Sequence, residues 1–237
     1  CNMACAFCAS GLRRKERNLT AAEMMGQIFV MNGLLDEKGE RVTHIVVMGT
    51  GEPFDNYDNV LGFIRSANDQ NGLAIGARHI TVSTCGLPEG IRRYGKEVLQ
   101  INLAISLHAP NDEIRKTLMP IARAYPLDVL MPAVKEYEEN AGRRVTFEYI
   151  LLKGLNDSLA HADELAALIK KYDIYAYVNL IPYNEVKEKP FKRTSSEAIH
   201  AFADRLMKLG INTTVRKEFG SDIDAACGQL RAKYLDK

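Results

Sequence analysis

The sequence contains no apolar run that approaches about 18 residues, the length that a membrane-spanning helix requires. It has no basic segment followed by an apolar segment and a cleavage signal at its start, so nothing indicates secretion. Neither sign of charge dominates: 31 Lys and Arg against 30 Asp and Glu give a net charge of +1, which neither supports nor excludes a polyanionic partner. These absences predict a soluble, cytoplasmic protein, and 46% hydrophobic residues in 237 suffice for one sizeable core.

Cysteine is scarce and unevenly distributed. Of five cysteines, three lie within the first eight residues, which is a poor disulfide framework. Cys1, Cys5 and Cys8 form C-x3-C-x2-C with no fourth Cys or His nearby. Three thiolates can hold three irons of a cubane iron–sulfur cluster and leave the fourth iron open, whereas a structural zinc site needs a fourth protein ligand. The spacing favours the cluster, and a zinc site completed by His108 or Cys85 remains an alternative.

Short β-branched runs alternate with longer amphipathic stretches, which is typical of βα units that build a parallel sheet. Repeated βα crossovers give either a doubly wound open sheet or a full or partial barrel. The predicted strands lie near 43–49, 78–84, 101–107, 145–151, 175–181 and 212–217. Further helices are predicted near 57–70, 88–96, 127–140 and 158–171, with Pro132 expected to displace the start of the third of these.

Two capping boxes mark the starts of two more helices. Thr20 with Glu23 precedes an apolar helical face of Met24, Ile28, Met31 and Leu35. Thr194 with Glu197 precedes a second such helix, which Gly210 ends.

Polar and glycine-bearing motifs follow four of the predicted strands, at 49–53, 83–86, 106–110 and 182–184. Ligands of parallel α/β sheets bind at the carboxyl ends of the strands, so we expect these four segments to converge on one site. Gly49 and Gly51 do not open a dinucleotide fingerprint, because Glu52 and Pro53 follow and no third glycine begins a helix.

Eight blocks of sequence carry a narrower resemblance: CNMACAFCASG, RNLTAAE, MGTGEPFDNYDNV, ITVSTCG, LAISLHAPND, VTFEYILLKGLNDS, VNLIPYN and FGSDIDAACGQL. In this order they resemble the bacterial dual-specificity rRNA and tRNA adenine-C2 methyltransferases of the radical S-adenosylmethionine (SAM) superfamily. The resemblance implies an α/β fold, a partial (β/α)6-type barrel of parallel strands over residues 1–237. It also implies that the first strand and an N-terminal helical domain lie upstream of residue 1, and that residues 218–237 form a segment carrying a methyl-accepting cysteine.

The same resemblance implies the functional residues. Cys1, Cys5 and Cys8 match the ligands of a 4Fe–4S cluster, and Cys227 matches the cysteine that becomes S-methylated. The positions that match SAM contacts are Gly51, Glu52, Ser83, Ser106, Leu107, His108 and Asn184. Implied partners are 23S rRNA, tRNA and an electron donor such as flavodoxin, and a monomer is expected. The run Arg13, Arg14, Lys15 and Arg17 is either a phosphate-binding loop or a solvated basic loop.

The implied chemistry follows from the substrate. Adenine C2 lies between two ring nitrogens and is electron-poor, so it does not attack the methyl group of SAM as an ordinary nucleophile, and a carbon radical is required. In the family, one SAM methylates the counterpart of Cys227, a radical from a second SAM removes hydrogen from that methyl group, and the methylene radical adds to C2. The second cysteine and the base of this reaction match no position here, and both are expected upstream of residue 1.

Two alternatives remain open at this point. The sister enzyme that methylates adenine C8 shares the cluster motif and the DAACGQL block, although GTGEPFDNYDNV and LIPYN favour the C2 enzyme. A non-catalytic iron–sulfur or zinc protein that binds RNA or carries electrons would have no SAM site and no role for Cys227.

Overall fold

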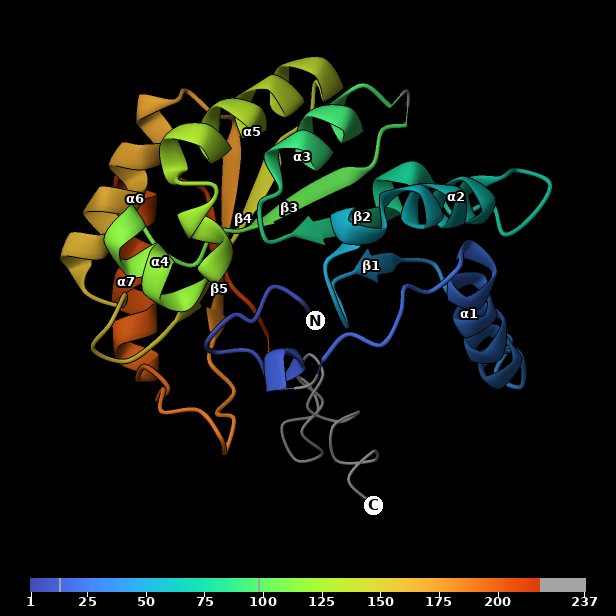
Figure 1. Ribbon diagram of the computed structural model, residues 1–237, viewed down its shortest axis with the longest axis horizontal. Coiled ribbons are helices and arrows are strands. Elements are labelled where there is room, and N and C mark those ends of the chain that lie inside the picture. Colours follow the sequence, from blue (N-terminus) through green and yellow to red (C-terminus); the bar gives the residue numbers. More distant parts are fainter. Residues whose placement is uncertain (13, 98, 218–237) are drawn as a thin grey trace.

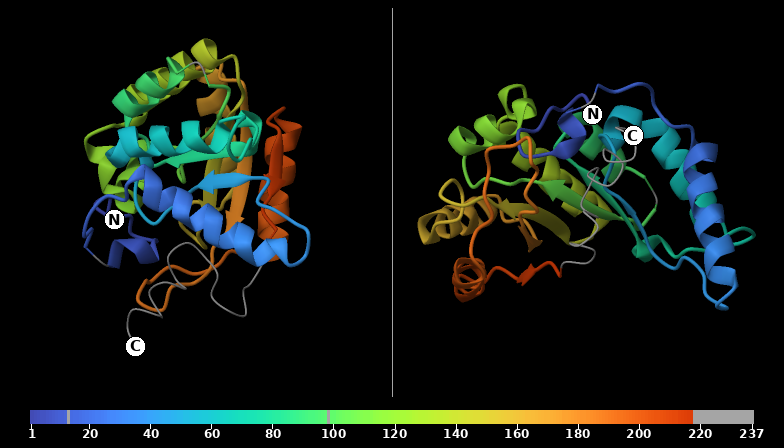
Figure 2. Two further views of the ribbon diagram at one scale, coloured as in Figure 1. Left: turned by 90° about the vertical axis from the view of Figure 1, so that its right-hand side faces the viewer. Right: turned by 90° about the horizontal axis from the view of Figure 1, so that it is seen from below.

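The computed structural model describes residues 1–12, 14–97 and 99–217, so Cys227 and the segment 218–237 lie outside the described residues. Six parallel strands form one sheet, in which they follow one another in chain order (Figure 1). They are β1 (Ile45–Val47), β2 (Ile80–Thr84), β3 (Asn102–Ser106), β4 (Val145–Leu151), β5 (Ala176–Pro182) and β6 (Thr213–Val215). All six predicted strands are confirmed, and the sheet curves as a partial barrel with helices on its outer face (Figure 2).

Seven α-helices connect and flank the described strands. They are α1 (Ala21–Asp36), α2 (Tyr57–Asn68), α3 (Pro88–Gly95), α4 (Asp112–Leu118), α5 (Leu127–Ala141), α6 (Leu159–Lys171) and α7 (Ser196–Lys208). Short 3-10 turns lie at Ala9–Leu12, Pro53–Asn56, Ala77–His79 and Pro120–Arg123. The sequence did not predict α4. Among the described helices, none has both the length and the apolar character needed to cross a membrane.

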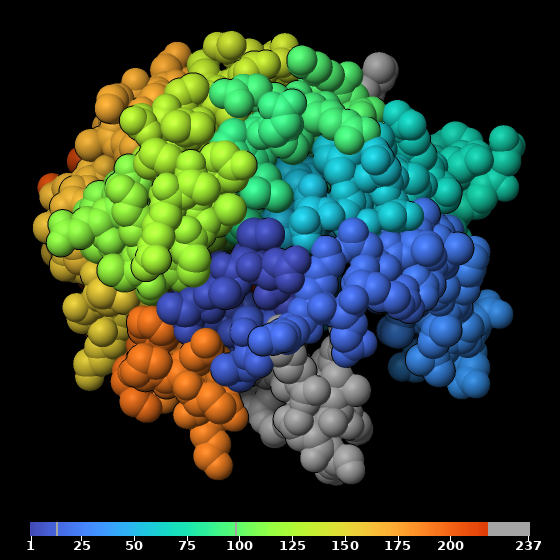
Figure 3. All heavy atoms as spheres, viewed as in Figure 1, coloured from blue at the N-terminus to red at the C-terminus, as the bar shows by residue number. Residues whose placement is uncertain are grey.

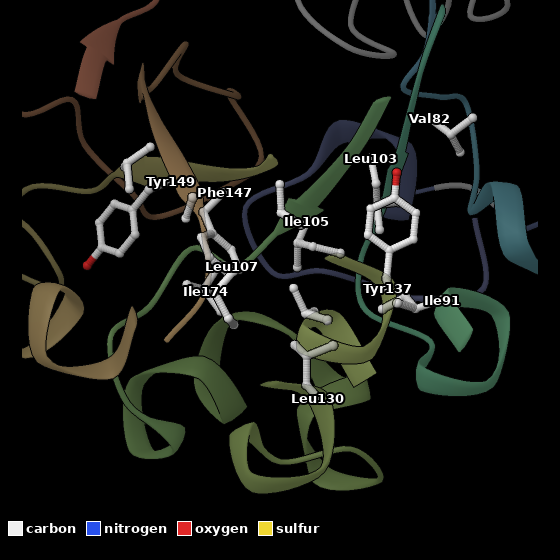
Figure 4. Packing of buried hydrophobic residues seen from close by; sticks show 14 of the residues in the cluster. Val82, Ile91, Leu103, Ile105, Leu107, Leu130, Tyr137, Phe147, Tyr149 and Ile174 are labelled. Atoms are coloured by element: carbon white, nitrogen blue, oxygen red, sulfur yellow. The ribbon is translucent and has the colours of Figure 1, made fainter. Parts of the chain in front are cut away.

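The main core fills the space between the sheet and the outer helices (Figure 4). Leu103 and Ile105 of β3 are fully buried, and Leu130 of α5 is fully buried in the same cluster. Burying one such side chain contributes roughly 1.5–3 kcal/mol, so this layer holds the strands in a fixed register. A second, smaller cluster includes Leu118, Leu152 and Tyr183, of which the last two directly follow the carboxyl ends of β4 and β5.

Helix α1 begins as predicted, but its apolar face is only partly covered. The Thr20 hydroxyl accepts a hydrogen bond from the Glu23 N–H (3.2 Å), and the Glu23 carboxylate accepts one from the Thr20 N–H (2.9 Å). Of the predicted face, Met24, Ile28 and Leu35 are half-buried, whereas Met31 is 47% exposed. The reason is that α1 packs mainly on α2 rather than across the sheet.

Two predicted helix starts need correction. Ser195, not Thr194, caps α7 by accepting a hydrogen bond from the Ala198 N–H (3.3 Å), because the Thr194 hydroxyl donates to Asp157 instead (2.8 Å). Pro132 does not displace the start of α5 and lies inside that helix. The start is fixed by Pro126 at the N-cap and by the hydrogen bond from the Leu127 N–H to the Asp112 carboxylate (3.0 Å).

Candidate functional site

A cavity of about 560 Å³ opens at the carboxyl ends of the strands. The residues that the sequence singled out and that line it are Cys1, Cys5, Cys8, Gly51, Glu52, Ser83, Ser106, His108 and Asn184. The predicted convergence of four strand-end segments on one site is therefore confirmed. Leu107 is the exception, because its side chain is fully buried in the main core and does not line the cavity.

Residues 1–8, which we call the cysteine loop, lie across this end of the sheet, against α4 and the loop after β5 (Figure 3). The Ala6 N–H donates to the Leu118 carbonyl at the end of α4 (2.8 Å), and the Tyr183 hydroxyl donates to the Phe7 carbonyl (3.3 Å). Within the loop, the Cys8 N–H donates to the Cys5 carbonyl (3.2 Å). These contacts tie the loop to two other elements, so the three thiols are fixed relative to the strand ends.

The donor chemistry of this loop fits an iron–sulfur cluster. Burial, followed by the nearby Cys8 and Glu52, raises the pKa of the Cys5 thiol to about 12. Bound iron favours the thiolate and reverses this preference. Each cysteine of a cubane site binds a different iron, so its thiols need not converge on one ion. Across residues 1–12, 14–97 and 99–217, no three His, Cys, Asp or Glu side chains are grouped to hold a metal ion.

Cys85 lines the same cavity but is held by other contacts. Its thiol hydrogen-bonds to the Glu52 carboxylate, and burial followed by the Glu52 charge raises its pKa. Burial raises the pKa of both the Cys5 and the Cys85 thiols, so the pKa does not separate them, and what distinguishes Cys85 is its hydrogen bond to Glu52.

The turn after β1 depends on two glycines and a buried carboxylate. Gly49 and Gly51 have φ of 148° and 139°, a region that side chains other than glycine rarely adopt. Glu52 accepts hydrogen bonds from the Phe54 N–H (3.0 Å) and the Cys85 N–H (2.8 Å). Burial raises the pKa of Glu52 even though these N–H groups lower it. Glu52 thus links the turn after β1 to the end of β2 while it lines the cavity.

His108 lines the cavity as a neutral imidazole. Burial, followed by the charge of Arg115, lowers its pKa to about 3. Its Nδ1 accepts a hydrogen bond from the Ile150 N–H (3.1 Å), which leaves the proton on Nε2. The ring of Phe7 makes an edge contact with the imidazole at 4.9 Å between centroids. Because His108 also has a positive φ of 59°, its position depends on neighbours that hold the backbone.

Asn156 is the main such neighbour, and sequence reasoning gave it no role. Its side chain is fully buried and donates to the His108 carbonyl (2.8 Å) and the Ile150 carbonyl (2.7 Å). Its Oδ1 accepts from the Leu152 N–H (2.8 Å). One amide therefore joins the turn after β3 to the end of β4.

Glu148 is a second residue that sequence reasoning missed. It is a buried carboxylate on β4, lines the cavity, and pairs in register with Ser106 of β3 and Asn179 of β5. The Asn179 amide donates to Glu148 (2.9 Å), and the hydroxyls of Ser83 and Ser106 lie 3.5 Å apart. The available signal was a single carboxylate inside the apolar run VTFEYIL. Together these side chains form a polar row across the inner face of the sheet.

We expect Glu148→Gln to stabilise the protein at neutral and alkaline pH. Burial raises the pKa of Glu148 in the folded state, so its contribution to stability is present below the unfolded pKa and is lost as pH rises through the folded one. Glutamine keeps an acceptor for Asn179 and cannot ionise. The gain in the free energy of unfolding should be on the order of 1 kcal/mol at pH 8 and vanish near pH 4, as measured by urea denaturation.

Glu52→Gln is the matched control for this experiment. Both oxygens of Glu52 accept backbone N–H groups, so an amide NH₂ would replace one needed acceptor, and this variant should be destabilised at both pH values. A Glu148→Gln protein that is less stable than wild type at pH 8 would contradict the assignment of burial as the main cause.

The basic run is partly neutralised by neighbouring acids. Lys15 pairs with Asp55 (2.6 Å), and Arg17 makes two hydrogen bonds to the Glu23 carboxylate (2.6 and 2.8 Å). Arg14 lines a second cavity of about 490 Å³ between the cysteine loop, α1 and β1, and Arg13 lies outside the described residues. Two of the four cations, Lys15 and Arg17, are thus engaged in surface ion pairs. An RNA phosphate that bound either of them would have to displace its carboxylate partner.

Known proteins match this chain over nearly its whole length. The model of the radical SAM superfamily matches residues 1–166. The chain is 56% identical over 240 residues to the "Probable dual-specificity RNA methyltransferase RlmN" of Enterococcus faecalis, covering all of this chain and 67% of that protein. The protein of the same name from Streptococcus mutans is 55% identical, covering all of this chain and 66% of that protein. This chain therefore spans about two thirds of the length of these curated relatives.

A solved structure agrees with these relatives. The crystal structure of a radical SAM methyltransferase from Sphaerobacter thermophilus is similar with a TM-score of 0.93 and 47% sequence identity. The match covers 97% of this chain and 67% of that chain. The chain belongs to the radical SAM superfamily and, within it, to the family of dual-specificity RNA methyltransferases.

Proposed function

We propose that this chain is the catalytic domain of an enzyme that methylates C2 of adenine in 23S rRNA and in tRNA. The observation that carries the proposal is one cavity in which three thiols of a C-x3-C-x2-C loop meet Ser83, Ser106 and His108. The names of relatives at 55–56% identity, dual-specificity RNA methyltransferases, support RNA as the substrate. The proposal includes a cytoplasmic monomer and a one-electron donor such as flavodoxin.

Radical SAM proteins use a 4Fe–4S cluster and SAM, and the residues of this site suit both. Cys1, Cys5 and Cys8 would hold three irons. A cluster bound there would supply the one electron that reductive cleavage of SAM requires. The turn containing Gly51 and the polar groups at the strand ends would bind and orient SAM.

The electrostatics of the lining suit a sulfonium cation. His108 stays neutral because its pKa is low, so it can donate a hydrogen bond without repelling the positive sulfur of SAM. Glu148 adds a buried carboxylate to the same wall. Apolar side chains such as Phe7, Met119 and Ile150 also line the cavity and would limit the access of water to a radical.

In this proposal residues 1–237 form the catalytic domain, and residues 218–237 contribute the sulfur that carries the methyl group. Cys227 would accept a methyl group from SAM, and the carbon of that group would then be transferred to C2 of adenine. The second cysteine and the base match no position in the sequence.

Cys227→Ala in the full-length protein tests this role. After anaerobic reconstitution the variant should contain as much iron and sulfide as wild type but should yield no methylated RNA, because only the carrier of the methyl group is lost. Mass spectrometry of ribosomal RNA nucleosides gives the readout. Normal methylation by Cys227→Ala would contradict the proposal.

The wild-type product and metal content distinguish the two alternatives. A C8-methyl product would identify the sister enzyme. One zinc atom per chain after anaerobic purification, without an iron signal, would favour a non-catalytic binding protein.

A further inference from the structure

Arg115 of α4 is the largest fully buried side chain among the described residues, and it does not line the cavity. Its guanidinium donates to three main-chain carbonyls: Cys85 (2.8 Å), Tyr125 (3.2 Å) and Leu107 (3.3 Å). A planar guanidinium has five N–H donors in a fixed fork, so few other side chains could serve three carbonyls at once.

Two of these carbonyls belong to the turns that form the cavity. Cys85 follows β2, and its own N–H is held by Glu52. Leu107 follows β3 and directly precedes His108. Arg115 therefore connects the turns after the neighbouring strands β2 and β3 by hydrogen bonds, without itself lining the cavity.

The same helix also holds the cysteine loop. The carbonyl of Leu118, at the end of α4, accepts the hydrogen bond from the Ala6 N–H between Cys5 and Cys8 (2.8 Å). Met119, the next residue, lines the cavity. A shift of α4 would thus move the cysteine loop and the two strand-end turns together.

Gly86 shows how closely this guanidinium is packed. A Cβ added at Gly86 would lie 3.1 Å from Arg115 Nη2 and 3.0 Å from a methyl carbon of Leu130, and Gly86 has a φ of 101°. Any side chain at position 86 would press on the guanidinium. The local sequence is therefore adapted to the buried arginine.

The charge of Arg115 lacks a carboxylate partner within ion-pair distance in the part of the chain that the structure describes. Buried charges in proteins are normally paired. The ionisable groups that act on it are the thiols of Cys85 and Cys5 and the carboxylate of Asp112, which itself accepts the Leu127 N–H. Cys5 is the one of the three proposed cluster ligands that acts on Arg115, so a thiolate at Cys5 would supply negative charge to this cation.

We propose that Arg115 is a positioning residue of the SAM and cluster site, which locks the strand-end turns to the cysteine loop and offsets the negative charge of the ligating Cys5 thiolate. The proposal rests on the proposed function only in taking Cys1, Cys5 and Cys8 as cluster ligands. It concerns this chain's own contacts and requires no particular RNA product.

The test compares Arg115→Met, Arg115→Lys and the control Lys116→Met in the anaerobically reconstituted full-length protein. Lys116 is an exposed cation on the same helix. The measurements are iron and sulfide per chain, the midpoint potential of the cluster by EPR-monitored titration, and the Kd for SAM. Arg115→Met should lower the midpoint potential and raise the Kd on the order of tenfold, since it removes the charge and leaves three carbonyls without donors.

Arg115→Lys should restore the potential but not SAM affinity, because one ammonium cannot reach three carbonyls in the same plane. Lys116→Met should match wild type in all three measurements. If Arg115→Met does not fold, Gly86→Ala carries the test: it displaces the guanidinium without removing its charge, so the Kd should rise while the potential stays near wild type.

An unchanged Kd or an unchanged potential in folded Arg115→Met would overturn the proposal, and so would an unchanged Kd in Gly86→Ala where that variant carries the test. Failure of the proposed function would look different. It would appear as a missing or different RNA product in the wild-type protein, while the potential and SAM affinity still respond to Arg115.

Discussion

Replacing Cys5 with alanine is expected to abolish assembly of the iron–sulfur cluster. Iron and sulfide per chain, measured after anaerobic reconstitution, should fall to the background of the assay, and reductive cleavage of SAM should fall with them. The physical reason is that three thiolates hold three separate irons, so the loss of one leaves a second iron without a protein ligand. Cys5 is also the middle ligand in the sequence and directly precedes Ala6 and Phe7, whose main-chain groups bond to α4 and to Tyr183.

Cys85→Ala is the matched control, because Cys85 is a thiol in the same cavity whose hydrogen bond goes to Glu52. It should keep its iron and sulfide. Equal loss of iron from both variants, or full iron in Cys5→Ala, would show that the cluster is held in another way. Measuring the free energy of unfolding of the cluster-free Cys5→Ala protein shows whether iron is lost merely because the variant is misfolded.

Asn156→Ala is expected to have the largest effect on stability of any substitution of an uncharged polar residue near the site. Three buried main-chain groups, of His108, Ile150 and Leu152, would lose their partners. An unsatisfied buried group costs about 1–3 kcal/mol, so the free energy of unfolding should fall by at least about 3 kcal/mol. Urea denaturation followed by circular dichroism measures this directly.

The effect should also reach the site, because the His108 backbone has a positive φ that Asn156 helps to maintain. Asn156→Asp keeps the acceptor for Leu152 but removes both donors, so it should weaken SAM binding as well. Asn71 is exposed, and Asn71→Ala should change stability by no more than about 0.5 kcal/mol. An Asn156→Ala protein within 1 kcal/mol of wild type would mean that water replaces the lost partners.

The regular elements of the fold followed from local patterns. The β-branched runs predicted all six strands, and the Thr20 capping box predicted the start of α1. Errors arose where two local signals competed. Thr194 and Ser195 are both good caps, and only the hydrogen bond from Thr194 to Asp157 shows which of them is occupied elsewhere. Helix α4 was missed because it is short and its anchoring residue, Arg115, is a charged residue that points into the core.

The sequence also predicted some features of the site correctly and others not. Cysteine spacing predicted the three thiols, and the polar segments at strand ends predicted where the site forms, since parallel strands end at the same edge of a sheet. The resemblance implied the other six of the nine predicted residues that line the cavity. Leu107 belonged to the right segment, but it follows the end of β3 and its side chain is fully buried in the main core. Cys227 remains a prediction, since it lies outside the described residues.

The sequence by itself determined the kind of fold, the cysteine loop and the edge of the sheet at which the site forms, because these depend on spacing and on periodic burial. Only the tertiary structure decided the roles of Arg115, Asn156 and Glu148. Their importance comes from hydrogen bonds to main-chain groups and from burial of charge. Such contacts join residues that are far apart in the chain, and no local pattern of residue types encodes which main-chain groups a buried polar side chain will meet.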